Sequence, residues 1–369
     1  MSQRVFTPPP SAPDLKAAAK ALRVNFLMGF NDEATVRVDA VDPDGRIAYF
    51  FNGNVGFDAY WSLVPPANRR TVFLSPTKMT VPPADVIVNC IVEPDAMRGA
   101  LGLAEALIDQ VRGVRPVEVI NEPRHVTRTR RDEVAEAYGD LPGLAFPRTD
   151  RFRPARVQDV LDHVRESGLS YPVLVRPAGT QSGFRMVRLD DPAADRDLLE
   201  RFAYTGGEFY VSEFRDFHSA DGLYRKVRLL VIDGVVYPRH LIIDREWQIH
   251  SKSRANLMAG DAALRGEERA FFERFPESLP AGALESLRAV AADLKLDYFG
   301  VDGTVLPDGR FFVFELNAAM KGFEQDGLDV FPHLARPVQR VRDAFETMVV
   351  RRGEPLLRRA GRRPVEAPP

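Results

Sequence analysis

Short runs of consecutive apolar residues, each about the length of a buried strand, recur through the first third of the chain. They lie at 24–30 (VNFLMGF), 71–75 (TVFLS), 85–91 (DVIVNCI) and 117–121 (VEVIN). After Pro94 the spacing changes to that of a helix, with one apolar stripe formed by Met97, Leu101, Ile108 and Val111. Strands that alternate with a helix are typical of α/β domains, so the pattern predicts a small α/β domain over residues 23–122.

In the second half of the chain the strand-like runs follow one another with few helices between them. The pattern predicts helices at 156–168 and 283–295 and strands at 172–177 and 209–214. It also predicts hairpins at 226–242 and 299–317. Successive strands joined by short connections form antiparallel sheets. This half is therefore expected to have an α+β layout.

The two ends of the chain differ from the rest. Residues 1–22 are rich in Pro and Ala and are expected to extend along the surface or to stay mobile. Residues 351–369 contain three Arg-Arg pairs and a Pro-rich end, which predicts a solvated, disordered tail. A partner-binding arm is the alternative for this tail.

Composition narrows the class of protein. With 45% hydrophobic and 28% charged residues and a net charge of −2, the chain resembles an ordinary soluble protein. The near-neutral charge argues against a nucleic-acid partner, and no apolar run approaches the roughly 20 residues that cross a bilayer. Cys90 is the only cysteine and lies in an apolar run, where a small buried residue is expected. These features, and an N-terminus without a secretory signal pattern, predict a cytoplasmic location without membrane attachment.

The sharpest local signal is the segment 299–317, FGVDGTVLPDGRFFVFELN. Its Asp308-Gly309 pair is the dipeptide favoured in two-residue type I′ turns, and counting outward from such a turn places Asp302 opposite Glu315. Because strand side chains alternate, Asn317 joins them on the same face. Two carboxylates this close repel each other unless a cation lies between them, and oxygen ligands of this kind suit Mg²⁺. The alternative is a half-exposed hairpin with incidental polar residues.

Several motifs together resemble the ATP-grasp superfamily, in particular prokaryotic glutathione synthetase and the ribosomal-protein glutamate ligase (RimK-like). They cover about 118–320 and occur in the family's order: VINEP (119–123) with TRTRRDE (127–133), PVLVRPAGTQSGFRMVRL (172–189), YVSEFRD (210–216), KVRLLVIDG (226–234), SRANL (253–257), and GVDG (300–303) with FELN (314–317). The resemblance implies an α+β ATP-grasp fold at residues 123–350, preceded by the α/β pre-grasp domain at 23–122. Its two lobes, at about 123–208 and 209–350, would enclose ATP.

The resemblance also implies a nucleotide site. The segment 172–189 resembles the loop that covers the triphosphate, which implies phosphate-binding roles for Arg176, Gly179, Gln181 and Ser182. Arg176 stands where the family usually has Lys, and a guanidinium is bulkier than an ammonium group. The strand 210–216 resembles the segment that holds adenine and ribose, which implies roles for Glu213, Phe214 and Asp216. Read from the residues alone, the loop could be an ordinary turn, and Glu213 a solvated carboxylate.

Catalytic roles follow from two further motifs. Arg228 and Arg254 are expected to stabilise charge on the transferring phosphoryl group, and Asn256 to orient the acyl oxygen. Arg239, His240 and Lys252 complete a group of basic residues, in which a structural role for His240 is the simpler expectation. Asp302, Glu315 and Asn317 would hold the Mg²⁺, with Mn²⁺ as a possible substitute.

The implied activity is a carboxylate–amine ligase that forms an acyl phosphate from ATP and releases ADP and phosphate. Its substrates would be small-molecule or peptide carboxylates and amines, and related ligases commonly form homo-oligomers. Two alternatives remain: a phosphotransferase that releases a phosphorylated product, and a catalytically silent nucleotide-binding scaffold. The sequence contains no GxxxxGK[ST] loop, no GxGxxG after a strand and no kinase HRD or DFG set.

Overall fold

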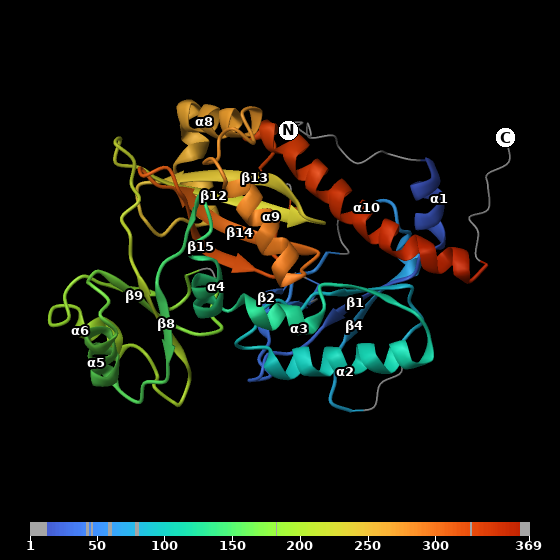
Figure 1. The fold of residues 1–369 in the computed structure, drawn as a ribbon, viewed down its shortest axis with the longest axis horizontal. Helices are drawn as coiled ribbons and strands as arrows, with labels where there is room; N and C mark the ends of the chain where they lie inside the picture. Colours follow the sequence, from blue (N-terminus) through green and yellow to red (C-terminus); the bar gives the residue numbers. More distant parts are fainter. Residues whose placement is uncertain are drawn as a thin grey trace.

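The computed structural model describes residues 13–41, 44–45, 47–57, 61–77, 81–181, 183–324 and 327–361. Figure 1 shows an N-terminal part in blue and cyan, a green part beside it, and a yellow-to-red part above both. We call the last two lobe one and lobe two. None of the helices in the described ranges is long and apolar enough to pass through a lipid bilayer.

The N-terminal domain is built on a parallel sheet of order β4-β1-β5-β6. Its strands have the bounds Val24–Met28 (β1), Arg69–Phe73 (β4), Val86–Asn89 (β5) and Glu118–Ile120 (β6). The expected strands and the helix after Pro94, α2 (Arg98–Val114), are thereby confirmed. Leu27 and Ile87 pack in the core that includes α2, whereas Phe26 and Val88 face the long helix α10 (Ala335–Arg359). Both faces are covered, which explains why these strands read as continuous apolar runs. An additional hairpin, β2 (Arg37–Val41) and β3 (Ile47–Phe50), was not predicted.

Lobe one is a four-stranded antiparallel sheet of order β10-β9-β11-β8 with its own apolar core. Its elements are β8 (Thr149–Phe152), α5 (Val157–Ser167), β9 (Val173–Pro177), β10 (Val187–Leu189), α6 (Arg196–Glu200) and β11 (Phe209–Glu213). β11 pairs with both β8 and β9. The expected lobe boundary at residues 208/209 is therefore wrong, because it assigns β11 to lobe two. The connection from the N-terminal domain contains α3 (Pro123–Val126) and α4 (Arg131–Tyr138).

Lobe two is a five-stranded sheet of order β13-β12-β14-β15-β7. Its strands are β7 (Leu144–Ala145), β12 (Tyr224–Ile232), β13 (Val235–Asp244), β14 (Tyr298–Val305) and β15 (Phe311–Asn317), and its helices are α7 (Ser251–Asn256), α8 (Ala262–Glu273) and α9 (Ala283–Leu294). Along β12, Val227, Leu229 and Val231 pack with α8 and α9, while Leu230 and Ile232 face α10. The α+β class and the predicted elements of this half are confirmed. Short 3-10 helices lie at Pro66–Asn68, Thr127–Thr129, Met258–Gly260 and Pro332–Leu334.

Both expected flexible ends are partly wrong. Residues 13–21 form helix α1 (Pro13–Ala21), and residues 351–359 continue α10. The two helices pack together. A Cβ added at Gly353 would clash with Leu22, directly after α1, and with Val86 on β5, so α10 approaches the N-terminal domain closely here. Arg351 and Arg352 are exposed and form ion pairs with Asp233 and Asp297. Residues 1–12 and 362–369 lie outside the described residues.

The β14–β15 hairpin has the predicted pairing of Asp302 with Glu315, although its turn differs from the prediction. The amide of Gly309 donates to the carbonyl of Leu306, and the amide of Leu306 to the carbonyl of Arg310, which makes a three-residue loop with Gly309 in the left-handed region (φ 77°). The extra loop residue shifts the pairing by one. A bulge between Gly303 and Asp302 shifts the pairing back by one residue, and so restores the expected pair of Asp302 with Glu315.

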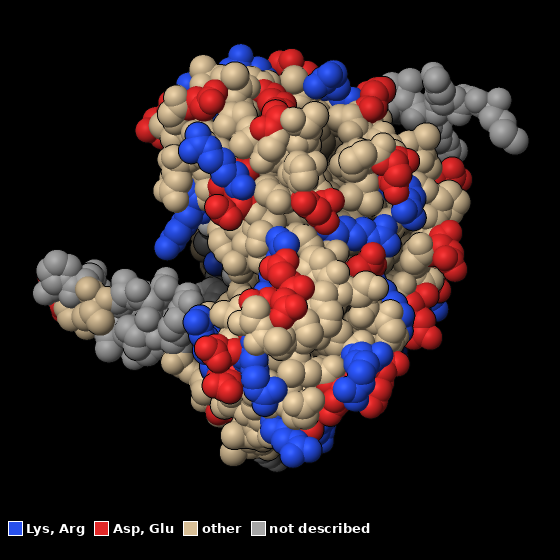
Figure 2. All heavy atoms as spheres, turned by 90° about the vertical axis from the view of Figure 1, so that its left-hand side faces the viewer, with Lys and Arg blue, Asp and Glu red and all other residues tan. Residues whose placement is uncertain are grey.

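Figure 2 looks onto the side that carries the two lobes and shows acidic and basic side chains lying next to one another over this face. This mixture agrees with the near-neutral net charge of the chain.

Candidate active site

A row of polar residues crosses the sheet of lobe two. Cross-strand pairing aligns His240 with Arg228, Arg228 with Asp302, and Asp302 with Glu315, on β13, β12, β14 and β15. Arg228 donates to both oxygens of Asp302, from Nε to Oδ1 at 2.7 Å and from Nη2 to Oδ2 at 2.8 Å. Lys226 Nζ lies 3.5 Å from Oδ2 of Asp302. Because paired residues share a face, these side chains form one continuous charged strip.

Arginine holds both carboxylates of this row in the charged form. Burial alone would raise the pKa of Asp302, but Arg228 and Lys226 lower it to about 2. Burial and Asp302 likewise oppose ionisation of Glu315, yet Arg131, which donates to its Oε2, lowers the pKa of Glu315 below the ordinary value. Both acids are therefore anions at neutral pH.

The donor set of Asp302, Glu315 and Asn317 fits a hard cation. It supplies two ionised carboxylates on paired positions, and the Asn317 amide lines the adjoining pocket. Within the described part of the chain there is no group of three or more His, Cys, Asp or Glu side chains that could hold a metal, so a divalent ion here would depend on the amide and on substrate oxygens. Arg228 and Arg131 already bond the same two carboxylates, and a metal would share those oxygens with them.

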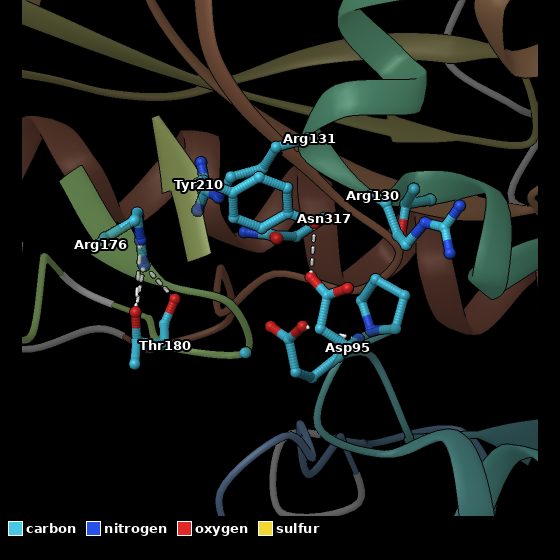
Figure 3. Close-up of a pocket in the computed structure, with 11 residues that line it drawn as sticks. Asp95, Arg130, Arg131, Arg176, Thr180, Tyr210 and Asn317 are labelled. Atoms are coloured by element: carbon cyan, nitrogen blue, oxygen red, sulfur yellow. Dashed lines mark hydrogen bonds between the residues drawn. The ribbon is translucent and has the colours of Figure 1, made fainter. Parts of the chain in front are cut away.

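The adjoining pocket lies where lobe one, lobe two and the N-terminal domain meet (Figure 3). It is lined by Glu93, Pro94, Asp95, Thr129, Arg130, Arg131, Arg176, Gly179, Thr180, Tyr210 and Asn317. Arg176 is buried near the end of β9, and its guanidinium donates to Thr180. Thr180 lies in the loop that follows β9 and contains Gly179, which we call the glycine loop. Burial, and then Arg131, lower the pKa of Arg176 to about 9. Among the residues that the structure describes, no carboxylate forms an ion pair with Arg176.

The glycine loop packs against the N-terminal domain. Gly179 has φ 76°, and a Cβ there would lie 2.7 Å from the Cβ of Ala96, so only glycine fits without a shift. Gln181 donates to Glu93 at 3.0 Å, away from the phosphate role expected of it. Ser182 lies outside the described residues.

The other expected catalytic residues lie away from this pocket. Arg254 on α7 donates to both oxygens of Glu268 at 2.6 and 2.7 Å, and Glu268 is fully buried. Asn256 is exposed at the end of the same helix, and Lys252 is also exposed. The structure therefore places Arg254 in a buried ion pair and puts Asn256 and Lys252 on the surface.

Arg254 nevertheless belongs to a basic cluster with Arg228, Arg239 and His240. Burial, followed by Arg228, Arg254, Arg239 and Lys226, lowers the pKa of His240 well below its ordinary value, which keeps the imidazole neutral. Arg239 donates to the backbone carbonyls of Gly322 and Glu324. The sequence thus identified a set of basic residues that the fold does bring together.

The residues expected to hold adenine and ribose lie at the end of β11. Phe214 is buried, with the Arg188 guanidinium 4.3 Å from its ring centre and the Trp247 ring at 5.4 Å. Glu213 pairs with Arg215 at 2.7 Å, and Asp216 with His218 at 2.7 Å. Their nucleotide roles stay predictions.

Sequence reasoning gave no role to five charged or aromatic residues of the pocket: Glu93, Asp95, Arg130, Arg131 and Tyr210. A signal existed for the two acids, because Glu93 and Asp95 lie in the segment after the buried strand β5, and carboxyl ends of parallel strands commonly carry ligand sites. Arg131 lies in the basic stretch 127–133, but the pattern alone did not distinguish it from its arginine neighbours.

Comparisons with known proteins come from structure alone, since no family model and no curated protein matches the chain. D-alanine–D-alanine ligase from Bacillus anthracis complexed with ATP is 13% identical over 92% of this chain and 99% of that chain, with a TM-score of 0.49. A RimK domain ATP-grasp protein from Sphaerobacter thermophilus DSM 20745 is 16% identical over 86% and 99%, with a TM-score of 0.40. Carboxyaminoimidazole ribonucleotide synthase from Aspergillus clavatus complexed with ATP is 14% identical over 72% of this chain but only 63% of that chain, with a TM-score of 0.42.

Proposed function

We propose that this chain is an ATP- and magnesium-dependent ligase that joins a carboxylate to an amine through an acyl phosphate. The observation that carries the proposal is the pocket in which Arg131, Arg176 and Asn317 converge beside the Asp302–Glu315 pair. The resemblance of six ordered motifs to ATP-grasp ligases supports the same reaction. The carboxylate could belong to a small molecule or to a peptide.

The charges around the pocket support the following reaction. The γ-phosphoryl group passes to a substrate carboxylate, which forms the acyl phosphate and releases ADP. The amine then attacks the acyl carbon, a C–N bond forms, the C–O bond to phosphate breaks, and the amine loses a proton. Arg176 and Arg131 would bind phosphoryl oxygens throughout, and such fixed charges stabilise the transition state without a protein nucleophile.

The metal would add charge neutralisation at the carboxylate pair. When bound by Asp302, Glu315 and Asn317, a magnesium ion would polarise the β- and γ-phosphate oxygens of ATP. Arg228 holds Asp302 in place from the other side, and the row of paired strands fixes both acids on a rigid sheet.

One observation favours the alternative of a silent nucleotide-binding scaffold. Each of the two carboxylates is already bonded by an arginine, Arg228 on Asp302 and Arg131 on Glu315. An arginine pair neutralises an acid without any metal, so the same residues could be held for structure alone.

A turnover screen separates these functions. The protein is incubated with ATP, Mg²⁺ and paired amino acids and dicarboxylates, ADP release is measured, and products are identified by mass spectrometry. The ligase predicts ADP together with an amide, and Glu315→Gln, which keeps the shape of the side chain, should abolish both. A phosphorylated product would support the phosphotransferase. Intact ATP binding with no ADP from any pair would support the scaffold.

A further inference from the structure

Two adjacent carboxylates of the N-terminal domain form one wall of the pocket. Glu93 and Asp95 lie in the segment after β5, and both line the pocket. Glu93 is 7% exposed, and the side chain of Asp95 is 6% exposed. Burial and then the neighbouring Asp95 raise the pKa of Glu93, and burial raises that of Asp95. Such a pair is costly unless a positive charge lies near it.

The hydrogen bonds of the pair leave one oxygen without a donor. Glu93 accepts from the amide of Asp95 at 3.0 Å and from Gln181 at 3.0 Å. Oδ2 of Asp95 accepts from the Tyr210 hydroxyl at 2.7 Å. Oδ1 of Asp95 is buried and accepts no hydrogen bond within the described structure. Its nearest cations, Arg98 and Arg151, are each 3.9 Å away, beyond hydrogen-bonding range.

The opposite wall of the pocket carries positive charge. Figure 3 shows Arg176 and Thr180 on one side, Asp95 on the other, and Arg131 above them. Neither Glu93 nor Asp95 forms a hydrogen bond with any arginine in the described ranges, although Arg130, Arg131 and Arg176 line the same pocket. Arg131 and Arg176 therefore lie across the pocket from Asp95, whereas Arg130 lies on the same side as Asp95.

We propose that Glu93 and Asp95 bind the ammonium group of the amine substrate. This assignment rests on the proposed ligase function and specifies its second substrate as a protonated primary amine. An ammonium group has three N–H donors, and Glu93 and Asp95 both line the pocket as carboxylates that accept only neutral donors. The same site holds the amine nitrogen beside Arg131, Arg176 and Asn317, where the acyl phosphate would form, and the nitrogen attacks after one of its protons has passed to solvent.

The charges of the pocket favour an ammonium ion over the other cations considered. A divalent metal needs several oxygen ligands with ordered geometry, whereas here two carboxylates share the pocket with three arginines. An anion or a neutral hydroxyl nucleophile would add no positive charge beside Glu93, whose hydrogen-bond donors, Gln181 and the amide of Asp95, are neutral. The site therefore selects aliphatic amines that are charged at neutral pH.

Hydroxylamine provides a direct test, because it is a nucleophile that is uncharged at neutral pH and traps acyl phosphates as hydroxamates. The variants Glu93→Gln and Asp95→Asn keep the shape of the side chains and an acceptor for Gln181 or Tyr210. For the amine identified in the turnover screen, KM should rise about 10- to 100-fold, the loss expected for a charge-assisted hydrogen bond. Hydroxamate formation should stay within about threefold of the unmodified protein.

Asp85→Asn is the matched control, since Asp85 is another buried carboxylate of the same domain but pairs with Arg23 outside the pocket. It should change neither nucleophile's KM. The inference is overturned if Glu93→Gln and Asp95→Asn leave the amine KM unchanged, or if they slow hydroxamate formation as much as amide formation. That second result would indicate a structural role.

Calorimetry measures amine binding without turnover, so it tests the ammonium site independently of the ligase activity. The unmodified protein, with a non-hydrolysable ATP analogue bound, is titrated with the twenty amino acids and simple diamines, which requires no turnover. Absence of hydroxamate with every carboxylate would reject the ligase. Binding of an amine that Glu93→Gln and Asp95→Asn weaken would still support the ammonium site, and no binding by any amine would reject it.

Discussion

The buried pair of Arg228 and Asp302 gives the most demanding prediction. Asp302 is 3% exposed, and Arg228 donates to both of its oxygens from the neighbouring strand. Replacement of Asp302 by Asn keeps the size of the side chain but removes its charge. Arg228 then keeps two neutral acceptors, the introduced amide oxygen and Lys321 O at 3.0 Å, but loses its bonded carboxylate.

The magnitude follows from the lowered pKa and from the uncompensated arginine. The pKa of Asp302 is about 2 against an ordinary 3.8, and at about 1.4 kcal/mol per pKa unit this favours the charged acid by about 2 kcal/mol. Burial of Arg228 without its partner adds to this, so Asp302→Asn should lower the free energy of unfolding by about 3–5 kcal/mol. The double change Arg228→Met with Asp302→Leu should recover most of this loss, since apolar residues need no countercharge.

Urea unfolding followed by tryptophan fluorescence measures this effect. The chain has two tryptophans. A Trp61→Phe background leaves Trp247, between β13 and α7, as the reporter for lobe two. Because the folded pKa of Asp302 is lowered, its contribution is present above the ordinary pKa and disappears as the pH falls towards 2. If Asp302→Asn and the unmodified protein unfold within about 1 kcal/mol of each other, the buried pair does not exist as described.

Three further changes test other parts of the account. Gly179→Ala should raise the KM for ATP at least tenfold, because a Cβ there meets Ala96 of the N-terminal domain. Gly206→Ala, where φ is similarly positive but nothing lies within 4 Å of the added Cβ, should leave the KM unchanged. Equal effects of the two changes would show that contact between the glycine loop and the N-terminal domain does not affect ATP binding. Asn121→Ala should lower the free energy of unfolding in urea by about 2–4 kcal/mol, because the Asn121 side chain makes four hydrogen bonds to residues near β14 and β15. A loss below about 1 kcal/mol would contradict this prediction. Arg254→Met should lower thermal stability by stranding Glu268, and Arg254→Met with Glu268→Gln should regain part of it; no recovery would mean that the two side chains act independently.

Local patterns predicted the strands well because each buried strand of this protein carries its own signal. The N-terminal strands are covered on both faces and read as apolar runs, and the hairpins carry alternation and turn residues. Even so, the pairing of Asp302 with Glu315 was correct only because a longer turn and a bulge cancel each other. A bulge depends on local packing around Phe314 and has no reliable sequence signal.

Long-range packing accounts for what the sequence did not predict. Arg-Arg pairs and Pro355 favoured a disordered tail after Arg351, whereas Leu356 and Leu357 are buried, and Leu357 lies in the core shared with the N-terminal domain. β11 resembled the start of lobe two because it precedes the β12–β13 hairpin, yet it pairs with β9. The acidic wall of the pocket lies on a third domain, so no motif within the ATP-grasp region could identify it.

Transfer of a carboxylate oxygen to phosphate tests the central proposal most directly. The carboxylate substrate identified in the turnover screen is labelled with heavy oxygen and incubated with ATP, Mg²⁺ and its amine, and the released phosphate is analysed by mass spectrometry. An acyl-phosphate ligase predicts one labelled oxygen in the phosphate and one in the amide, in equal amounts. Unlabelled phosphate, with both labelled oxygens retained in the carboxylate, would contradict the proposed reaction.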